Sequence, residues 1–217
     1  MATAGDVFHN PVTGAHAVVL LGADDTEGRY TACAVTLPGG ARRAHPHVHP
    51  GLVEAVEVRC GEVAVVVDRE ERALGPGERL VVAPGVRHDL LNRGAADAEV
   101  VLEVWPGRRF ELLAATLFGL AREGRTDEHG MPDPLQLAVI AREFAGEVRW
   151  CSPPRAVQAL AFGLLAPLAR LRGRQAVYPR HLRPCDRVEV PAWPERPAPR
   201  RHDAPARPPA APVVAAA

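Results

Sequence analysis

The chain has 217 residues, with 26 basic and 26 acidic side chains and a formal net charge of zero. This balance argues against a nucleic-acid partner and makes a membrane partner an unfavoured interpretation, because both surfaces attract an excess of positive charge. All basic residues are arginine, which excludes mechanisms that need a nucleophilic or Schiff-base lysine. The length predicts one domain with an appendage.

The cysteines and the N-terminal residues indicate the cellular compartment. The four cysteines are scattered, without a CxxC pair, so they indicate neither a disulfide framework nor a zinc knuckle. They are Cys33, Cys60, Cys151 and Cys185. The first 14 residues lack the basic stretch and apolar run of a signal peptide. We therefore expect a cytoplasmic protein.

The first half of the chain has the pattern of an all-β domain. Residues 6–14 are predicted to form an initial loop, because Asn10-Pro11 and Thr13-Gly14 are turn signals. Beyond them, short runs of β-forming residues alternate with turns. These runs are 16–21, 30–37, 53–58, 62–67, 72–74, 79–82, 88–91 and 99–104. Strands at this spacing predict an antiparallel sandwich or barrel, which we place within residues 1–107.

The second half has helical periodicity and then a change in composition. Helices are predicted over residues 109–122 and 135–149, and a third begins at Ser152-Pro153. They form an extension over residues 108–174. Proline, alanine and arginine dominate residues 175–217, and such a segment buries too little apolar surface to fold alone. We expect it to be a disordered tail.

The third predicted helix, which runs to about residue 171, is apolar on every side. Between residues 156 and 171 its only polar side chains are Gln158 and Arg170, and a kink is expected at Pro167. A helix of this kind is buried, and it is shorter than the roughly 20 residues that span a bilayer. We expect it to pack against the barrel or across a dimer. A helix lying in a membrane interface is less favoured, because its polar flank is thin.

A cluster of metal-binding side chain types follows the second β run. His47 and His49 are two residues apart and would project from one face of a strand. A turn at Pro50-Gly51 would bring Glu54 to the same point from the next strand. Two imidazoles and a carboxylate suit a first-row divalent metal, and His88 offers a further ligand.

The register of the histidine pair needs a choice, because His45 also lies two residues from His47. A 45/47 pair would need a carboxylate near residues 50–52, where the sequence is Pro-Gly-Leu. The 47/49 register is therefore preferred. His45 could still support a ligand or face a substrate.

Two sequence motifs resemble those of the cupin superfamily. The first reads HxH, four residues, Glu54, six residues, Gly61. The second begins at Gly77 and continues through APG and His88 to Asn92, with Ala83 where the family usually has proline. The helical segments resemble the C-terminal extension of a group of bacterial single-domain cupin proteins, as does the opening NPVTG.

The resemblance implies a small β-barrel or jelly roll, followed here by the three helices and the tail. It also implies metal binding by four residues, namely His47, His49, Glu54 and His88. Iron, manganese, zinc, nickel and copper all suit this ligand set. The second motif's Asn92 is expected at a turn or strand end, and the motif glycines at permissive backbone positions.

The implied function is a metal-dependent enzyme acting on a small organic molecule, with oxygenase, isomerase and cyclase chemistry all compatible. Glu54 could be a ligand only or could also carry a proton. By strand periodicity Val56, Val58 and Leu90 would line the interior, which favours an apolar molecule. Arg42 or Arg43 at the rim would change that expectation.

The alternative is a binding module without catalysis, whose helices mediate dimerisation or contact with a membrane surface. Variants Glu54→Gln and His88→Ala would separate the two interpretations through turnover and ligand binding. In either case the apolar third helix leads us to expect a homodimer.

Overall fold

The computed structural model describes residues 2–41 and 45–199 and contains two facing antiparallel sheets. The larger sheet has the order β12-β1-β2-β3-β10-β5-β8, which corresponds to Asp186–Arg187, Asp6–His9, His16–Leu21, Thr31–Leu37, Ala98–Trp105, Val53–Cys60 and Arg79–Val82. The smaller sheet has the order β11-β4-β9-β6-β7, which corresponds to Arg149–Trp150, His47–Val48, Arg87–Leu91, Val63–Val67 and Glu70–Leu74. The predicted β-sandwich or barrel is confirmed.

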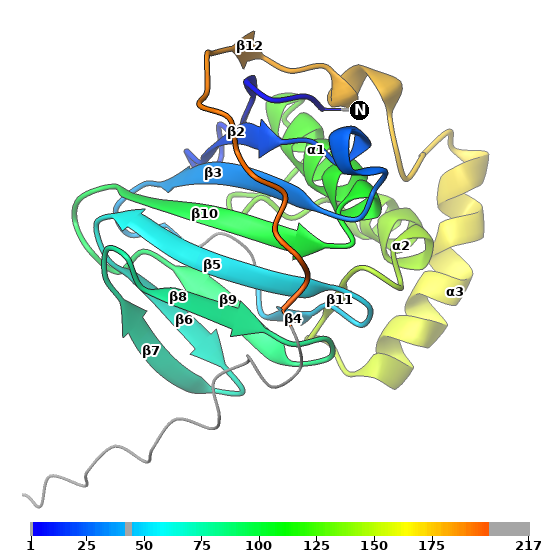
Figure 1. Cartoon of the computed structure of the whole chain (residues 1–217). Helices are drawn as coiled ribbons and strands as arrows, with labels where there is room; N and C mark the ends of the chain where they lie inside the picture. Colours follow the sequence, from blue (N-terminus) through cyan, green and yellow to red (C-terminus); the bar gives the residue numbers. More distant parts are fainter. Residues whose placement is uncertain (1, 42–44, 200–217) are drawn as a thin grey trace, which may run out of the picture.

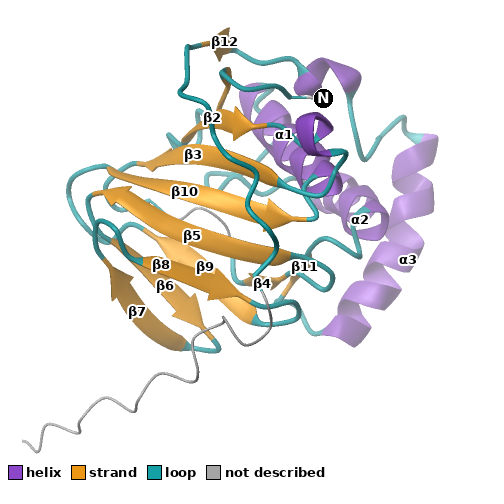
Figure 2. Ribbon diagram, viewed as in Figure 1, coloured by secondary structure: helices purple, strands orange, loops and turns teal. Residues whose placement is uncertain are grey.

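Three helices lie together at one end of the two sheets (Figures 1 and 2). They are α1 (Arg108–Arg122), α2 (Pro134–Glu143) and α3 (Arg155–Leu171). Two short 3-10 turns complete the elements, η1 (Asp24–Thr26) and η2 (Pro179–Leu182). The predicted helical extension is confirmed.

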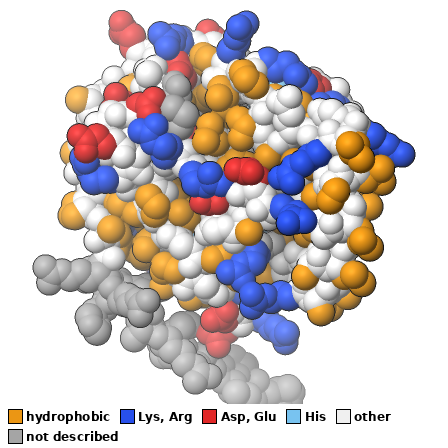
Figure 3. Space-filling model, turned by 90° about the vertical axis from the view of Figure 1, so that its right-hand side faces the viewer, with side chains coloured by type: hydrophobic (Ala, Val, Ile, Leu, Met, Phe, Trp, Pro, Cys, Tyr) orange, Lys and Arg blue, Asp and Glu red, His pale blue; other side chains and the backbone are white. Residues whose placement is uncertain are grey.

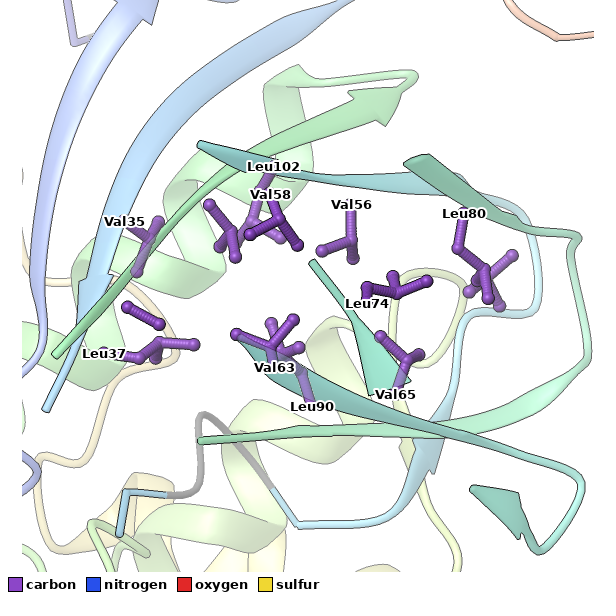
Figure 4. Packing of buried hydrophobic residues seen from close by; sticks show 13 residues of the cluster. Val35, Leu37, Val56, Val58, Val63, Val65, Leu74, Leu80, Leu90 and Leu102 are labelled. Atoms are coloured by element: carbon purple, nitrogen blue, oxygen red, sulfur yellow. The ribbon is translucent and has the colours of Figure 1, made fainter. Parts of the chain in front are cut away.

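The main hydrophobic core fills the space between the two sheets. Alternate residues of each strand point inward, as the two-residue period of a strand requires. Figure 4 shows these side chains meeting from both sheets. The buried members are Val35, Leu37, Val56, Val58, Val63, Val65, Leu74, Leu80, Val82, Leu90, Ala98, Val100 and Leu102. This packing fixes the faces on which the neighbouring polar side chains lie.

Gly61 shows why the first motif ends in glycine. It joins β5 to β6 with a φ of 76°, in the region that favours glycine. A Cβ at this position would lie 2.9 Å from the Cα of Ala98. The turn therefore needs a residue without a side chain. Gly77 and Gly85 also have positive φ values, so the expectation for the motif glycines is confirmed.

The N-terminal segment differs from its prediction. Residues 6–9 form β1, where a loop was expected, and β1 pairs with β2 on one side and β12 on the other. Phe8 is buried on this strand. The turn signals that suggested a loop apply only to residues 10–14, where the Asn10 side chain accepts hydrogen bonds from two main-chain N–H groups.

The second predicted helix ends earlier than expected. α2 begins after the N-cap Asp133 and stops at Glu143, six residues before the predicted end. Gly146 follows in a turn, and glycine lowers helix propensity. Residues 149–150 instead form β11, which pairs with β4. This pairing brings the extension against the strand that carries His47.

The third helix begins at Arg155 and packs mainly on α2, and it touches the barrel where Gln158 donates to the Trp150 carbonyl of β11. The expected packing across a dimer stays a prediction. Pro154 is its N-cap, two residues later than the predicted cap. Ala166 and Ala169 are fully buried against Ala138 and Val139 of α2. The small side chains allow this close approach, while Phe162 and Leu165 pack beside them and four other leucines of the helix stay exposed. Within the described ranges, no helix is long and apolar enough to cross a membrane.

The expectation of disorder from residue 175 onward is wrong up to residue 199. This segment forms η2 and β12 and then crosses the outer face of the larger sheet over β3, β10 and β5 (Figure 1). Trp193 packs against a cluster that contains Tyr30 and Trp105, and the Trp105 ring N–H donates to the carbonyl of Arg196. The segment folds because the sheet supplies apolar surface that its own composition lacks. The rest of the predicted tail, residues 200–217, lies outside the described residues.

Candidate metal centre

Four buried side chains converge at the end of the barrel next to the helices. His47, His49, Glu54 and His88 are between 1% and 4% exposed. Each offers one nitrogen or oxygen atom, and these four atoms all lie within 4.8 Å of one another. We call this group the histidine–glutamate cluster. It contains every residue that the sequence analysis named as a metal ligand.

The two sheets each contribute to the cluster. His47 on β4 lies directly opposite His88 on β9 in the antiparallel register, so their side chains share one face. Glu54 lies on β5 of the other sheet, opposite Val82 of β8. The chain between His49 and Glu54 crosses from one sheet to the other. The turn at Gly51 therefore joins two layers.

The distances in the cluster suit a shared cation. The Nε2 atoms of His47 and His49 are 3.2 Å apart. One oxygen of Glu54 lies 2.9 Å from Nε2 of His49 and 3.3 Å from Nε2 of His88. A first-row metal with bonds of about 2.0–2.2 Å needs neighbouring ligand atoms roughly 3.0–3.4 Å apart. The donor set thus fits a divalent transition metal.

The main chain fixes which nitrogen of each ring faces the cluster. The Nδ1 atoms of His47, His49 and His88 all lie at hydrogen-bond distance from main-chain carbonyls. A carbonyl only accepts, so each Nδ1 donates, and a neutral ring then offers its Nε2 to the cluster as an acceptor. Three lone pairs and a carboxylate then point at one another. Without a cation this arrangement would be electrostatically unfavourable.

The three carbonyl acceptors come from different parts of the chain. Those of His45 and Val86 each lie two residues before the histidine that they hold. The carbonyl that holds His49 belongs to Glu147, in the turn after α2. The neighbouring carbonyl of Gly146 accepts from the Gly51 N–H. The helical extension therefore orients part of the cluster.

Phe110 is the other contribution of the extension. Its ring meets the His49 ring edge-on, with centroids 5.9 Å apart. Phe110 lies within the predicted helix 109–122, and nothing in its residue type connected it with the histidines. Sequence analysis also missed Glu147, because a carbonyl acceptor leaves no signature in residue type. In addition, the prediction of a helix up to residue 149 placed Glu147 within that helix and not in a turn.

Other residues that were expected near the metal ligands are His45, Asn92, Arg42 and Arg43. His45 supports His47 through its carbonyl, and its ring meets that of His129 at 6.0 Å. Asn92 is buried at the end of β9, where its side-chain amide donates to the carbonyls of Leu37 and Ala96. This confirms the expected strand-end position. Arg42 and Arg43 lie outside the described residues.

The interior beyond the cluster is apolar. Val56 and Val58 follow Glu54 on the inward face of β5, and Leu90 follows His88 on β9 (Figure 4). All three are less than 5% exposed. The periodicity of the strands predicted this lining, and the prediction is confirmed. A molecule next to the cluster on this side would meet valine and leucine side chains.

Comparison with known families identifies the barrel. A family model described as "Cupin domain" matches residues 34–105, which include the whole histidine–glutamate cluster. No curated protein matches the sequence.

Several solved structures resemble parts of the chain. One is a protein from Silicibacter pomeroyi that is described as a sugar phosphate isomerase from a cupin superfamily. It is 25% identical, with 44% of this chain and 62% of that chain covered and a TM-score of 0.40. KdgF from Halomonas sp. is 23% identical, with 46% and 84% covered and a TM-score of 0.41. A predicted oxalate decarboxylase from Thermotoga maritima is 17% identical, with 49% and 99% covered and a TM-score of 0.43. The chain thus spans less than two thirds of the isomerase, and each match leaves the larger part of this chain uncovered.

Proposed function

Because residues 34–105 of this chain belong to the cupin superfamily, we propose that the protein is a metal-dependent enzyme acting on a small, rather apolar organic molecule. The histidine–glutamate cluster would hold one divalent transition metal. When bound, such a metal supplies Lewis acidity or, for iron, manganese or copper, redox chemistry. Oxygenation, isomerisation and cyclisation are the reaction classes that we propose to test.

The orientation of the three histidine rings is the observation that carries this proposal. Each ring donates from Nδ1 to a carbonyl and directs its Nε2 inward. A neutral histidine buried in a core without a metal would pair each ring nitrogen with a complementary group, an acceptor for its N–H and a donor for its other nitrogen. Here the three Nε2 atoms of the neutral rings and the Glu54 carboxylate are all acceptors, which is the arrangement that ligands of a cation require.

Glu54 is the residue to which we assign proton transfer. Its carboxylate is 1% exposed and contacts the rings of His49 and His88. It is the only acid in the cluster. A carboxylate in this position can hold the metal and can also accept a proton from a molecule bound beside it.

The substrate class follows from the side chains around the cluster. Val56, Val58 and Leu90 line the interior, and Phe110 covers the outer side of His49. Such a lining favours an aliphatic or aromatic body over a phosphorylated sugar. The polar group of the substrate would face the metal.

The first test is the metal content of protein purified without a polyhistidine tag or chelator and kept anaerobic. We expect close to one transition metal ion per chain by elemental analysis. The variants Glu54→Gln and His88→Ala should lose most of it, while His16→Ala, which removes an exposed histidine on β2, should retain it. Absence of metal from the wild type, together with failed reconstitution, would refute the proposal.

The second test separates an enzyme from a binding module. Metal-loaded protein is screened with small apolar acids, ketones and phenols, with and without oxygen, and product formation is followed by mass spectrometry. Turnover by the wild type that is lost in Glu54→Gln supports the enzyme. Ligand binding that both variants retain, without turnover, would support the alternative of a binding module.

A further inference from the structure

Helix α3 exposes a continuous row of large apolar side chains. These residues are 51%, 68%, 69%, 41% and 86% exposed, in the order Val157, Leu160, Leu164, Leu168 and Leu171. Among the described residues, only Val188 is a further exposed large hydrophobic side chain. Figure 3, which looks onto the side of the molecule that carries the helices, shows hydrophobic side chains gathered along its right-hand edge. An apolar row of this length on one helix marks an interaction surface.

The polarity of α3 is inverted relative to a helix on the surface of a monomer. Its side toward α2 carries Gln158, which is 9% exposed and donates to the carbonyls of Trp150 and Pro153. Its solvent side carries no charged residue between Arg155 and Arg170. A helix in contact with water normally places its polar residues outward. The outer side of α3 therefore has the character of a covered surface.

The spacing of the row indicates what covers it. Val157 and Leu160 lie seven and four residues before Leu164, and Leu168 and Leu171 lie four and seven residues after it. The row is thus symmetric about Leu164. In an antiparallel pair of identical helices with a two-fold axis at Leu164, Val157 of each copy would meet Leu171 of the other, and Leu160 would meet Leu168. A two-fold interface requires this reciprocal pairing.

The residues between the leucines permit close packing. Ala156, Gly163 and Pro167 lie on or beside the exposed side of the helix and leave depressions between the larger side chains. The leucines of a second helix can insert into such depressions, as knobs do into holes. In contrast, an interfacial membrane helix carries basic residues along its flanks, and α3 has none between residues 156 and 169.

The area available is sufficient for a dimer. A helix of 17 residues is about 25 Å long. A biological interface buries more than about 1,000 Å² in total, or roughly 500 Å² on each partner. Five large side chains that are 41–86% exposed, with the small residues between them, supply an area of that order.

We propose that the chain forms a two-fold homodimer in which α3 packs antiparallel against α3 of a second copy, centred on Leu164. This contact is independent of the metal centre. It buries the apolar row without placing a charge in its middle, since Arg155 and Arg170 lie at its ends. It also leaves the barrel of each copy free.

The mass in solution tests this proposal with the full chain. We expect light scattering after size exclusion to give twice the chain mass of 23.2 kDa at micromolar concentration. The variant Leu164→Arg should shift the protein to a monomer with an unchanged circular dichroism spectrum, because the side chain is exposed in the single chain. The matched control is Val188→Arg, which places the same charge at an exposed valine outside α3 and should leave the dimer intact.

Disulfide cross-linking tests the direction of the helices. Leu164→Cys should form a cross-link between copies under mild oxidation, since the two-fold axis brings residue 164 of both copies together. The single variant Val157→Cys should not form a cross-link between copies, because residue 157 lies opposite residue 171. The double variant with Val157→Cys and Leu171→Cys should form one. The linked peptides are identified by mass spectrometry, which separates them from the native cysteines. A cross-link in Val157→Cys alone would overturn the antiparallel arrangement.

Two results would overturn the proposal as a whole. One is a wild-type protein that stays monomeric at about 100 µM, a concentration at which even weak interfaces associate. The other is a dimer that Leu164→Arg leaves unchanged. A monomer that binds vesicles of anionic and neutral lipid, and loses this binding in Leu164→Arg, would assign the surface to a membrane instead.

Discussion

The ring of His49 donates a hydrogen bond from Nδ1 to the main-chain carbonyl of Glu147, which lies 98 residues later in the chain. This bond joins the histidine–glutamate cluster to the turn that follows α2. It means that the helical extension takes part in building the site, because the orientation of a ligand ring depends on the acceptor behind it. Arg109 holds the same turn by donating to the Glu143 carbonyl and the Glu147 carboxylate.

The first prediction concerns Arg109→Ala. Loss of this guanidinium should loosen the turn at Glu147 and weaken metal binding about 10-fold, the lower end of the range for residues that support ligands. Competition with a chromogenic chelator measures the affinity. Arg108→Ala is the matched control, since the neighbouring Arg108 pairs with Asp24 instead. Equal affinities in the two variants would show that the turn does not orient His49.

The second prediction concerns removal of the metal. Without it, the Nε2 atoms of three histidines and the Glu54 carboxylate are crowded together in a buried site. We expect a lower melting temperature after dialysis against a chelator, because bound metal at about 100 times its dissociation constant stabilises the folded state by about 2.7 kcal/mol. Differential scanning calorimetry checks this. The control is His88→Ala, in which the chelator should have little effect; a wild type that melts at one temperature in both states contradicts the prediction.

The third prediction concerns the pH dependence of stability. Burial raises the pKa of the Glu111 carboxyl, although hydrogen bonds from Thr31 and the Ala23 N–H act in the opposite direction. Both donors contact Oε1, and the other oxygen has no partner among the described residues. The folded state therefore binds this proton more tightly than the unfolded chain. Its contribution to stability is present below the ordinary glutamate pKa and is lost as the pH rises through the raised value.

Urea unfolding from about pH 4, near the ordinary glutamate pKa, up to about pH 8 measures this effect. The variant Glu111→Gln should have a smaller fall in stability with pH and should be more stable than the wild type at neutral pH by about 1 kcal/mol. Glu62→Gln, at an exposed turn, is the control and should follow the wild type. Parallel curves for all three proteins would contradict the role of Glu111.

The fourth prediction concerns the C-terminal segment that crosses the larger sheet. Trp193 donates to the Tyr30 hydroxyl at 2.7 Å, and that hydroxyl donates to Glu103 at 2.6 Å. The variant Trp193→Ala should lose about 2 kcal/mol of stability through packing and this bond. Trp193→Phe keeps most of the packing and should lose about 1 kcal/mol. Chemical denaturation measures both, and an unchanged midpoint for the alanine variant would show that the segment adds no stability.

Spacing in the sequence was sufficient to predict much of the site. Residues two apart on a strand share a face, so His47 and His49 had to point the same way. The same period placed Val56 and Val58 behind Glu54, where the structure has them. The positions of glycines in the turns followed from their backbone freedom. Each of these features depends on residues that are close together in the chain, so the sequence alone is enough to predict it.

The corrections concern contacts between distant segments. Trp193 lies in a proline-rich stretch that cannot fold alone, and it becomes ordered because Tyr30 and Trp105 supply its partners. The predicted helix extended to residue 149, but pairing with the edge of β4 made residues 149–150 a strand. In both cases a surface that is remote in the chain changed the local preference.

By itself, the sequence determined the β-barrel pattern, the three helices and the identity of the four clustered side chains, because each depends on residue type and short-range spacing. Only the tertiary structure decided that Glu147 supports His49, since a main-chain carbonyl is the same in every residue. It also decided that the apolar row of α3 faces outward. The hydrophobic effect has no direction, so the composition of α3 indicates that the helix is buried but not which of its sides contacts what. The packing of Ala166 and Ala169 on α2 determines which side remains exposed.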